Sequence, residues 1–471
     1  MVSKPARTVQ IMQGYGSLLA RRKYELLSNN PFVFSVTDYE EAVRNLQQWS
    51  ALAVLAQQVY DSLDAATRTA FFQMVLHPVL AGQIVVQLYT KVAFNKLYAA
   101  QGRVSANQAA LDAQSLFAQD AALTNRYHTM KGGKWNHVID QVHIGYTSWN
   151  EPGNNKNVMP NVTFLDSATT GGSVGVSVQG SSASYTAGSK VNIRSMDPYM
   201  PPGEQRYVDI YARKNGTYSW SISSNASYLT VSPQSGTINA PGNGSDARSV
   251  ISIDWTQVTS GISVASLNIT IGSDIITANV PVNKTTIPAG TKAFVESNGV
   301  ISIEAAHYSN PGAANATHVE IPHYGKTLSG VMLWPVTTGT KDVSKDTPLT
   351  YSLYTTTTTS KARLIVMFGA SLNYDPTRPL KFAYSLDGST PATVAPVTDI
   401  PVYKEGKDWS AAIQAGGWTS TIALTQAVTT GAHVLSIWLL EPGLIIQKVV
   451  LDMGGLKTSA LGPPESASVS S

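Results

Sequence analysis

The stretch from Lys131 to Pro152, KGGKWNHVIDQVHIGYTSWNEP, is denser than any other part of the chain in side chains that can bind or react. Imidazole, carboxylate, amide, indole and phenol groups occur together there. It is therefore the first candidate for an active site or a binding site. Its candidate residues are Trp135, Asn136, His137, Asp140, Gln141, His143, Tyr146 and Trp149.

The spacing of these groups argues against three familiar kinds of catalysis. His137 and His143 are not an i, i+4 pair, the spacing that puts two zinc ligands on one face of a helix. A serine nucleophile needs a sharp elbow turn, and no G-x-S-x-G occurs in the sequence. Asp140 and Glu151 would serve as a glycosidase pair only within a pocket, and nothing around them predicts one.

A structural role is the favoured interpretation of this segment. We expect a Gly-rich connector in which Trp135, Tyr146 and Trp149 anchor the chain by burying large aromatic surfaces. The polar side chains between them would satisfy backbone groups of an irregular segment packed beneath other domains. The alternative, which stays open, is that the segment forms one wall of a substrate cleft.

The composition limits what surrounds this segment. At 471 residues we expect about three domains. The chain has 33 Lys+Arg against 30 Asp+Glu, so its charge predicts neither a nucleic-acid partner nor an anionic membrane. It has 0 Cys, which excludes disulfides and thiolate chemistry. We see no signal peptide at the start and no run long enough to span a membrane.

Apolar residues at spacings of three and four predict a helical bundle over residues 1–130. A helix is expected from about 38 to 62, opened by a capping box of Thr37 and Glu40. The next helix starts at Ala65, is interrupted at His77-Pro78 and ends at Gly102. Ser105 and Gln108 predict a second capping box at the start of the last helix.

Short alternating strands replace helices in the second half of the chain. We expect an irregular connector over 131–170, an immunoglobulin-like β-sandwich over 171–287 and a jelly-roll sandwich over 292–462. The tail, residues 463–471, has few apolar residues and is expected to be disordered. The predicted fold class is thus a multidomain protein with a helical bundle followed by two β-sandwiches.

The β-rich half also contains N-x-[S/T] triplets, the acceptor signal for N-glycosylation. A Ser/Thr-rich region produces such triplets by chance, and a secreted glycoprotein is the alternative. The candidate positions are Asn161, Asn215, Asn225, Asn243, Asn268, Asn283 and Asn315.

The motif KGGKWNHVIDQVHIGYTSWNEPGNNKNVMP resembles the segment after the helical domain of the α-glucuronidases of glycoside hydrolase family 115. Upstream, AFFQMVLHPV and NKLYAAQGRVSAN are similar to that family in the same order. Downstream, ISIEAAHYS, LNYDPTRPLKFAYSLDG, HVLSIWLLEPGLIIQKVVLDMGG and LGPPES resemble its C-terminal β domain. The resemblance covers nearly the whole chain and is weakest over 165–290.

This resemblance implies enzymes that remove (4-O-methyl-)glucuronic acid from the xylan backbone of glucuronoxylan. Their catalytic carboxylates belong to a (β/α)8 barrel in the N-terminal half, and no alternation of strand and helix predicts a barrel here. We therefore expect the C-terminal half of such an enzyme, with no catalytic residue and no turnover of its own. The family also implies an extracellular protein and a homodimer.

In the last domain, Glu304 and Asp452 resemble positions at which carbohydrate-binding jelly rolls hold a structural calcium ion with oxygen ligands. A solvated Glu and a turn-capping Asp are the ordinary alternatives, and no other cofactor is expected. Five aromatic residues are candidates for a sugar-stacking platform, with core packing as the alternative. They are Trp334, Tyr374, Trp409, Trp418 and Trp438.

Two rival functions stay open at this point. The chain would act as a non-catalytic carbohydrate-binding protein for a plant cell-wall polysaccharide, or it would be a fragment of a gene with no independent role. The coding sequence upstream of Met1 distinguishes the second rival, because a parent enzyme predicts an in-frame barrel there.

Overall fold

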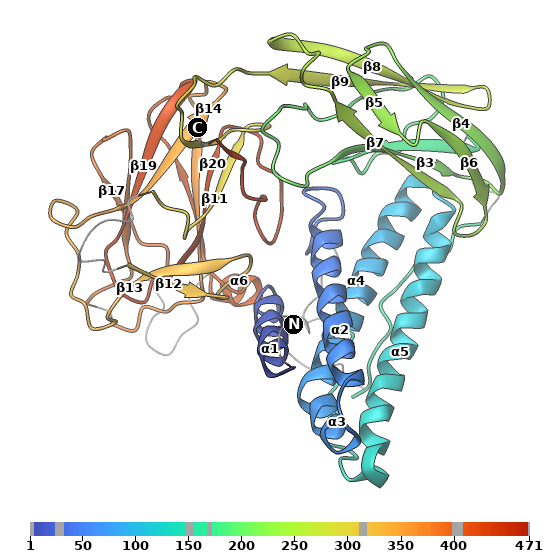
Figure 1. Ribbon diagram of the computed structural model, residues 1–471, viewed down its shortest axis with the longest axis horizontal. Helices are drawn as coiled ribbons and strands as arrows, with labels where there is room; N and C mark the ends of the chain where they lie inside the picture. Colours follow the sequence, from blue (N-terminus) through green and yellow to red (C-terminus); the bar gives the residue numbers. More distant parts are fainter. Residues whose placement is uncertain are drawn as a thin grey trace. The chain divides into compact units, whose positions relative to one another are not determined.

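The computed structural model describes residues 4–23, 33–146, 155–166, 172–309, 318–375, 377–397 and 408–469. It combines a helical N-terminal region with several β-sheets, so the predicted α and β multidomain class is confirmed (Figure 1). The chain forms two compact units. The first contains Met1–Tyr15, Tyr24–Pro198 and Glu204–Lys284, and the second contains Gly16–Lys23, Tyr199–Gly203 and Thr285–Ser471.

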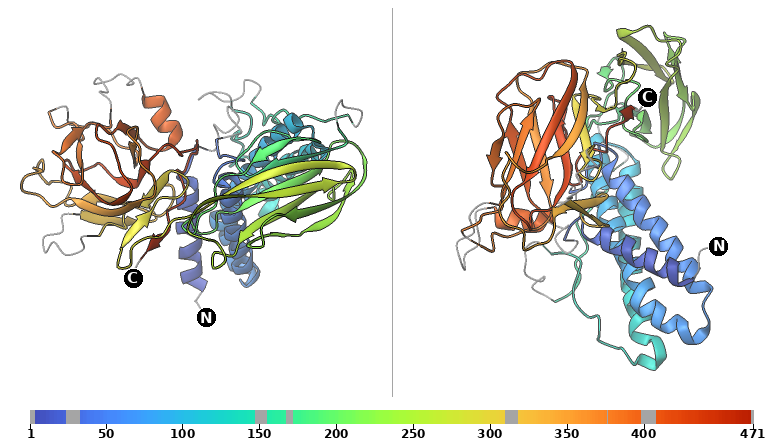
Figure 2. Two further views of the ribbon diagram at one scale, coloured as in Figure 1. Left: turned by 90° about the horizontal axis from the view of Figure 1, so that it is seen from above. Right: turned by 60° about the vertical axis from the view of Figure 1, so that its left-hand side comes forward.

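In the first unit α4 packs against both α2 and α5, and the three helices lie side by side (Figure 1, Figure 2). Trp49 is fully buried, and Gly82 of α4 makes room for it, because a Cβ there would lie 2.4 Å from its ring. The helical elements are α1 (Lys4–Leu19), α2 (Glu41–Asp61), α3 (Ala65–Phe71), a π-helical turn (Phe72–Leu76), α4 (His77–Gln101) and α5 (Ser105–Gly133).

Both predicted capping boxes are wrong, although the helices start close to the predicted positions. Glu40 precedes α2 with a φ of 50°, and the backbone N–H of Ser35 donates to the carboxylate of Glu41 instead. Val104 precedes α5 in a helical conformation, with its N–H donating to the carbonyl of Ala212. A tertiary contact thus takes the place of a side-chain cap at α5, whereas the bond at α2 joins residues only six positions apart.

The predicted interruption at His77-Pro78 takes the form of the π-helical turn. The ring of Pro78 cannot donate to a carbonyl one turn earlier, and the wider turn absorbs this mismatch without ending the helix. The combined span Ala65–Gln101 is long and apolar enough to cross a membrane by length and composition, which corrects our expectation that no such run exists. A core helix meets the same criterion, and α4 packs against α2 and α5.

The β-region of the first unit consists of two sheets. A four-stranded sheet has the order β1-β3-β7-β5 and a five-stranded sheet the order β2-β9-β8-β4-β6. Inward-facing residues alternate with outward-facing Ser, Thr and Asn along β8 and β9. The strands are β1 (Val174–Val178), β2 (Lys190–Asn192), β3 (Arg206–Ala212), β4 (Gly216–Ser224), β5 (Leu229–Ser232), β6 (Ser235–Ala240), β7 (Asp246–Ile253), β8 (Gly261–Ile271) and β9 (Asp274–Lys284).

The second unit is a sandwich of two mostly antiparallel sheets. One sheet has the order β17-β16-β19-β14-β10-β21, and the other has the order β12-β13-β20-β15-β18 with β11 paired to β20. Its elements are β10 (Ala293–Val295), β11 (Val300–Glu304), β12 (His318–Pro322), β13 (Ser329–Leu333), β14 (Leu349–Thr355), β15 (Arg363–Phe368), β16 (Phe382–Leu386), β17 (Ala392–Val394), α6 (Trp409–Ala415), β18 (Thr419–Ala423), β19 (Gly431–Leu439), β20 (Ile446–Asp452) and β21 (Ser468–Val469).

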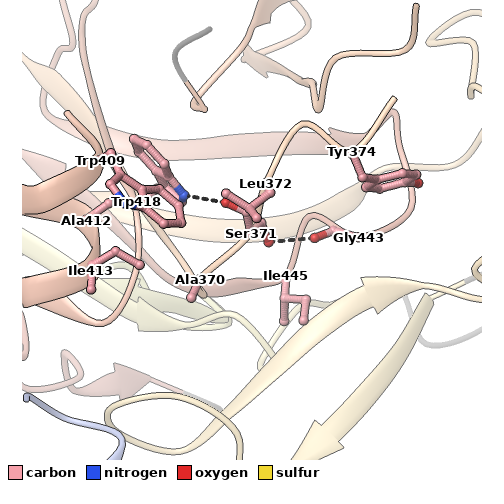
Figure 3. A pocket seen from close by; sticks show the side chains of 10 residues that line it. All are labelled: Ala370, Ser371, Leu372, Tyr374, Trp409, Ala412, Ile413, Trp418, Gly443 and Ile445. Carbon is pink, nitrogen blue, oxygen red and sulfur yellow. Dashed lines mark hydrogen bonds between the residues drawn. The ribbon is translucent and has the colours of Figure 1, made fainter. Parts of the chain in front are cut away.

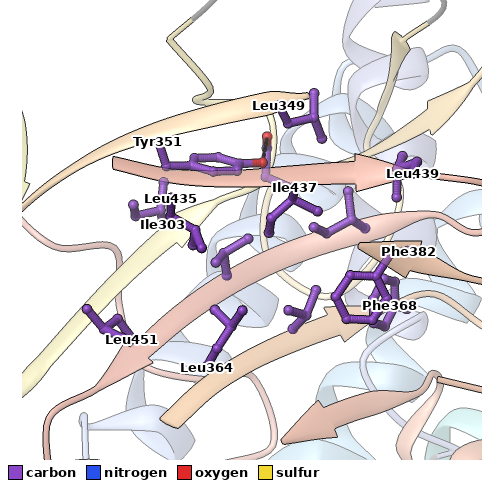
Figure 4. Packing of buried hydrophobic residues seen from close by; sticks show 14 of the residues in the cluster. Ile303, Leu349, Tyr351, Leu364, Phe368, Phe382, Leu435, Ile437, Leu439 and Leu451 are labelled. Carbon is purple, nitrogen blue, oxygen red and sulfur yellow. Dashed lines mark hydrogen bonds between the residues drawn. The ribbon is translucent and has the colours of Figure 1, made fainter. Parts of the chain in front are cut away.

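The core of this sandwich lies between its two sheets (Figure 4). Tyr351 and Ile437 come from one sheet and Leu364 and Phe368 from the other, and each is 0–1% exposed. The hydroxyl of Tyr351 donates to the carbonyl of Ala305 at 2.8 Å, so even the polar atom of this buried ring is satisfied.

The prediction of a disordered tail is wrong for residues 463–469. Strand β21 pairs with β10, and the carboxylate of Glu465 accepts hydrogen bonds from the backbone of Glu304 and the ring of His307. The tail was assigned to disorder because it has few apolar residues, but backbone and polar side-chain pairing orders it instead.

Candidate functional site

The connector after α5 begins with a reversal built on glycine. Lys131, Gly132 and Gly133 have φ values of 53°, 66° and 83°, a conformation that glycine adopts without steric cost. Trp135, expected as an anchor, stays partly exposed beside the ammonium group of Lys134, and Asn136 is exposed. Trp149 lies outside the described residues.

Two histidines of the connector bind aspartates. His143 contacts both carboxylate oxygens of Asp120 on α5, at 2.8 and 3.0 Å, and Asp120 is 2% exposed. Asn157 joins this pair because its amide donates to Asp120 and its oxygen accepts from the backbone N–H of His143. The carboxylate of Asp120 is thus committed to holding the connector and is not presented to a substrate.

His137 and Asp140 form a second, exposed pair at 2.6 Å, with His128 of α5 at 3.4 Å from the same carboxylate. Tyr146 is buried, and its hydroxyl accepts a hydrogen bond from Gln141. Among the candidates that the structure describes, His143 and His137 thus belong to two separate histidine–aspartate pairs, Gln141 bonds to the buried Tyr146, and Trp135 and Asn136 stay at the surface.

Two asparagines that the sequence did not single out fasten the later part of the connector, residues 155–166, to the bundle. Asn95 of α4 accepts from the N–H of Thr163 and donates to its carbonyl, both at 2.8 Å. Asn107 of α5 makes the same pair with Leu165, at 2.7 and 3.0 Å. Each side-chain amide thus makes the two backbone hydrogen bonds that a residue of a neighbouring β-strand would make. An isolated Asn in a helical pattern carries no signal for this role.

Replacing Asn95 with alanine is expected to release this part of the connector. The N–H of Thr163 would lose its protein partner, and the loss of this hydrogen bond should cost about 0.5–1.5 kcal/mol. Hydrogen exchange of the Thr163 amide should accelerate strongly. Asn125→Ala, at an exposed position of α5, is the matched control and should leave exchange unchanged. Equal protection in both variants would contradict the assignment.

The stability of the first unit is expected to depend on pH through two histidines, His77 and His143, whose pKa values shift in opposite directions. Burial lowers the pKa of His77 from 6.5 to about 4, against the attraction of Asp120. Since the unfolded state then binds the proton more tightly, stability should fall as the pH drops from about 6.5 to about 4. Burial also disfavours the charged form of His143, but its bond to Asp120 outweighs this and raises its pKa.

The contribution of His143 is therefore complete below its ordinary pKa of 6.5 and is lost as the pH rises through its higher folded-state pKa. Urea unfolding across pH 4 to 8 measures both effects. His77→Phe, which keeps the aromatic contact with Tyr127, should remove the loss on the acid side, and His143→Gln the loss on the alkaline side. A pH profile that neither substitution changes would refute the assignment.

A pocket of about 400 Å³ lies in the second unit and collects three of the five aromatic candidates (Figure 3). Trp409 comes from α6, Trp418 from the segment before β18 and Tyr374 from the loop after β15. Trp334 and Trp438 do not line it. The described residues that line it are Ala370, Ser371, Leu372, Tyr374, Trp409, Ala412, Ile413, Trp418, Gly443 and Ile445.

Residues 293–465, which include this pocket, match the model of the glycosyl hydrolase family 115 C-terminal domain. This part of the chain is similar to the family 115 C-terminal domain, and we use that name for it. The predicted family resemblance is thus confirmed for this part of the chain, which carries the motifs from ISIEAAHYS to LGPPE.

The fold is also similar to several solved structures. BtGH115A, a family GH115 4-O-methyl-α-glucuronidase with specificity for decorated arabinogalactans, is 14% identical over 94% of this chain and 39% of its own, with a TM-score of 0.49. The SafA pilin–SafB chaperone complex of Salmonella enterica is 12% identical over 30% of this chain and 71% of its own, with a TM-score of 0.18. The present chain thus spans 39% of the glucuronidase. No curated protein matches it in sequence.

The family 115 C-terminal domain keeps Glu304 and Asp452 apart. Register pairs Asp452 with Val300 and Glu304 with Lys448, which separates the two by roughly 13 Å along the strands. The carboxylate of Asp452 accepts from Arg363 at 2.6 Å, and that of Glu304 lies 3.1 Å from Lys448. These two residues therefore do not form one shared calcium site, whose ligands would all lie 2.3–2.6 Å from the ion.

The two carboxylates instead stabilise the strands that carry them. Burial alone would raise the pKa of Asp452, but the N–H groups of Leu456 and Gly454 and the guanidinium of Arg363 lower it. Asp452 thus caps a turn while it neutralises an arginine, as the ordinary alternative predicts. Calcium at another position of the domain stays a prediction.

The glycosylation candidates lie at the surface of the first unit where the structure describes them. Asn161, Asn215, Asn225, Asn243 and Asn268 are exposed and Asn283 is half-buried, whereas Asn315 lies outside the described residues. Glycan occupancy stays a prediction. The exposure of these side chains is a condition that glycosylation requires.

Proposed function

We propose that this chain is the non-catalytic C-terminal part of a family 115 α-glucuronidase that removes (4-O-methyl-)glucuronic acid from glucuronoxylan. The observation that carries the proposal is the match of residues 293–465 to the C-terminal domain of this family. In the parent enzyme, the acid and base of an inverting hydrolysis would belong to a barrel domain outside this chain.

The geometry of the first unit supports a scaffolding role for the connector. Asp120 of α5 and Asp140 of the predicted motif both bind histidines. The side-chain amides of Asn95 and Asn107 form hydrogen bonds with the backbone of the connector, at Thr163 and Leu165. These contacts support a connector that keeps the bundle and its neighbours in place. A wall of the substrate cleft remains the alternative role for its exposed residues.

The proposal includes an extracellular parent that forms a homodimer. Exposed N-x-[S/T] positions favour secretion through a glycosylating pathway. We also propose that the two β-regions are an immunoglobulin-like and a jelly-roll sandwich. A free-standing carbohydrate-binding protein for plant cell-wall polysaccharide is the second candidate function, and the observation that favours it is the aromatic pocket.

The test compares this chain with the polypeptide encoded by its extended reading frame. Release of 4-O-methylglucuronic acid from glucuronoxylan and from decorated arabinogalactan is measured for both. We expect no release by this chain and release by the extended polypeptide. Release by this chain alone, or an upstream coding sequence without a barrel, would overturn the proposal.

A further inference from the structure

The pocket of the family 115 C-terminal domain is held open by hydrogen bonds between the loops that form it. The indole N–H of Trp418 donates to the carbonyl of Ser371 at 2.8 Å, and the hydroxyl of Ser371 donates to the carbonyl of Gly443 at 2.7 Å (Figure 3). The N–H of Gly369 donates to the carbonyl of Ile445 at 2.8 Å. The pocket therefore exists before any ligand enters it.

Tyr374 lies at the opposite side of the pocket from Trp409 and Trp418 (Figure 3). Its side chain is 66% exposed, although it packs against Gly443, where a Cβ would lie 3.3 Å from the ring. Gly443 has a φ of 91°, so the turn favours glycine for its conformation as well as for space. Leu372 beside it is 46% exposed. Large apolar side chains left in water at a concave site are typical of ligand binding.

The chemistry of the lining selects one class of ligand. Among the residues that the structure describes, the ten that line the pocket carry no charge, and Arg378 is paired with Glu441 at 2.6 Å. Against these described residues a uronic acid would lose the hydration of its carboxylate without meeting a cation. A neutral sugar ring has an apolar C–H face that packs on an aromatic ring, and its hydroxyl groups stay at the open edge.

We propose that the pocket formed by Tyr374, Trp409 and Trp418 binds an uncharged pyranose residue of the polysaccharide backbone and not the glucuronic acid side group. This inference rests on the proposed function, because that function defines the polysaccharide. It adds that the C-terminal domain holds the substrate backbone while another domain removes the acid. One polysaccharide would thus contact two sites. The pocket of the C-terminal domain prefers an uncharged sugar, and the site in the other domain binds the charged acid.

The experiment measures binding by the whole chain with isothermal titration calorimetry. The probes are xylohexaose, the neutral oligosaccharide of decorated arabinogalactan and free glucuronic acid. We expect binding of a neutral oligosaccharide and none of glucuronic acid. Trp409→Ala should weaken binding about tenfold or more, which corresponds to about 1.4 kcal/mol. Tyr228→Ala, which removes a partly exposed tyrosine of the first unit, is the matched control and should bind normally.

Tyr374→Ala keeps the test decisive if Trp409→Ala fails to fold, since its exposed ring contributes little to the core. It should also weaken binding. No binding of any neutral oligosaccharide, preferential binding of glucuronic acid, or normal binding by both pocket variants would overturn the inference. If the extended polypeptide is active but the pocket binds no sugar, only this inference is refuted and the proposed function stands. If the pocket binds a sugar but the upstream sequence lacks a barrel, only the proposed function is refuted.

Discussion

Replacing Arg103 with alanine is expected to destabilise the first unit by about 3–5 kcal/mol, the usual cost of removing one partner from a buried ion pair. Arg103 follows α4 and is 2% exposed. Its guanidinium lies 3.4 Å from the carboxylate of Asp209 and 3.6 Å from that of Asp246, and it donates to the hydroxyl of Ser177. One side chain therefore connects the helical region with strands β1, β3 and β7.

Aromatic contacts add to this pairing. The guanidinium carbon of Arg103 lies 4.0 Å from the ring centroid of Tyr211 and 4.5 Å from that of Tyr98. Burial raises the pKa of Asp246, and Arg103 opposes that shift. Without the arginine, the partly buried carboxylate of Asp246 would lose part of its compensation, and the segment after α4 would lose its charged contact with the sheet.

Urea unfolding followed by circular dichroism measures the effect of the Arg103 substitution. Lys91→Ala removes a partly exposed ion pair with Asp112 in the same unit and should cost about 0–1 kcal/mol. Arg103→Lys should be intermediate, because it keeps the charge but loses the planar fork that reaches several partners. If Arg103→Ala is as stable as the Lys91→Ala control, the buried network around Arg103 contributes nothing to the stability of the first unit.

Deleting residues 461–471 is expected to destabilise the second unit by several kcal/mol. The carbonyl of Pro463 accepts from the ammonium of Lys448 at 2.9 Å and from the hydroxyl of Ser302 at 3.1 Å. Ser466 exchanges two hydrogen bonds with the backbone of Ser302, at 2.8 and 2.9 Å. Each buried donor left without a partner costs about 1–3 kcal/mol, so these losses accumulate.

Glu465→Ala isolates one part of the same contact. The backbone N–H of Glu304 would lose its acceptor, with an expected cost of about 1–3 kcal/mol. Lys361→Ala, an exposed position of the same unit, should change stability by less than about 0.5 kcal/mol. Thermal and urea unfolding of the three variants provide the measurement. A deletion variant as stable as the Lys361 control would contradict the ordering of this tail.

Local periodicity predicted which stretches form helices and strands. The spacing of apolar residues predicted a helix from about 38 to 62. In α2, Trp49, Ala53 and Ala56 are buried, whereas Val43, Leu46 and Tyr60 are half-buried. Gly102 was predicted to end α4, and it does so with a φ of 69°. These features are predictable because neighbouring residues of one element decide them, through side-chain direction and backbone conformation.

The family resemblance of residues 293–465, the helices and the strand-rich half were thus predictable from the sequence, because motifs and periodicity are properties of short segments. Only the tertiary structure decided that Trp409, Trp418 and Tyr374 line one pocket while Trp334 and Trp438 do not. It also decided that Asn95 pairs with Thr163 and that the polar tail is ordered. Such contacts join residues far apart in the chain, and they depend on which elements pack together, which no local pattern records.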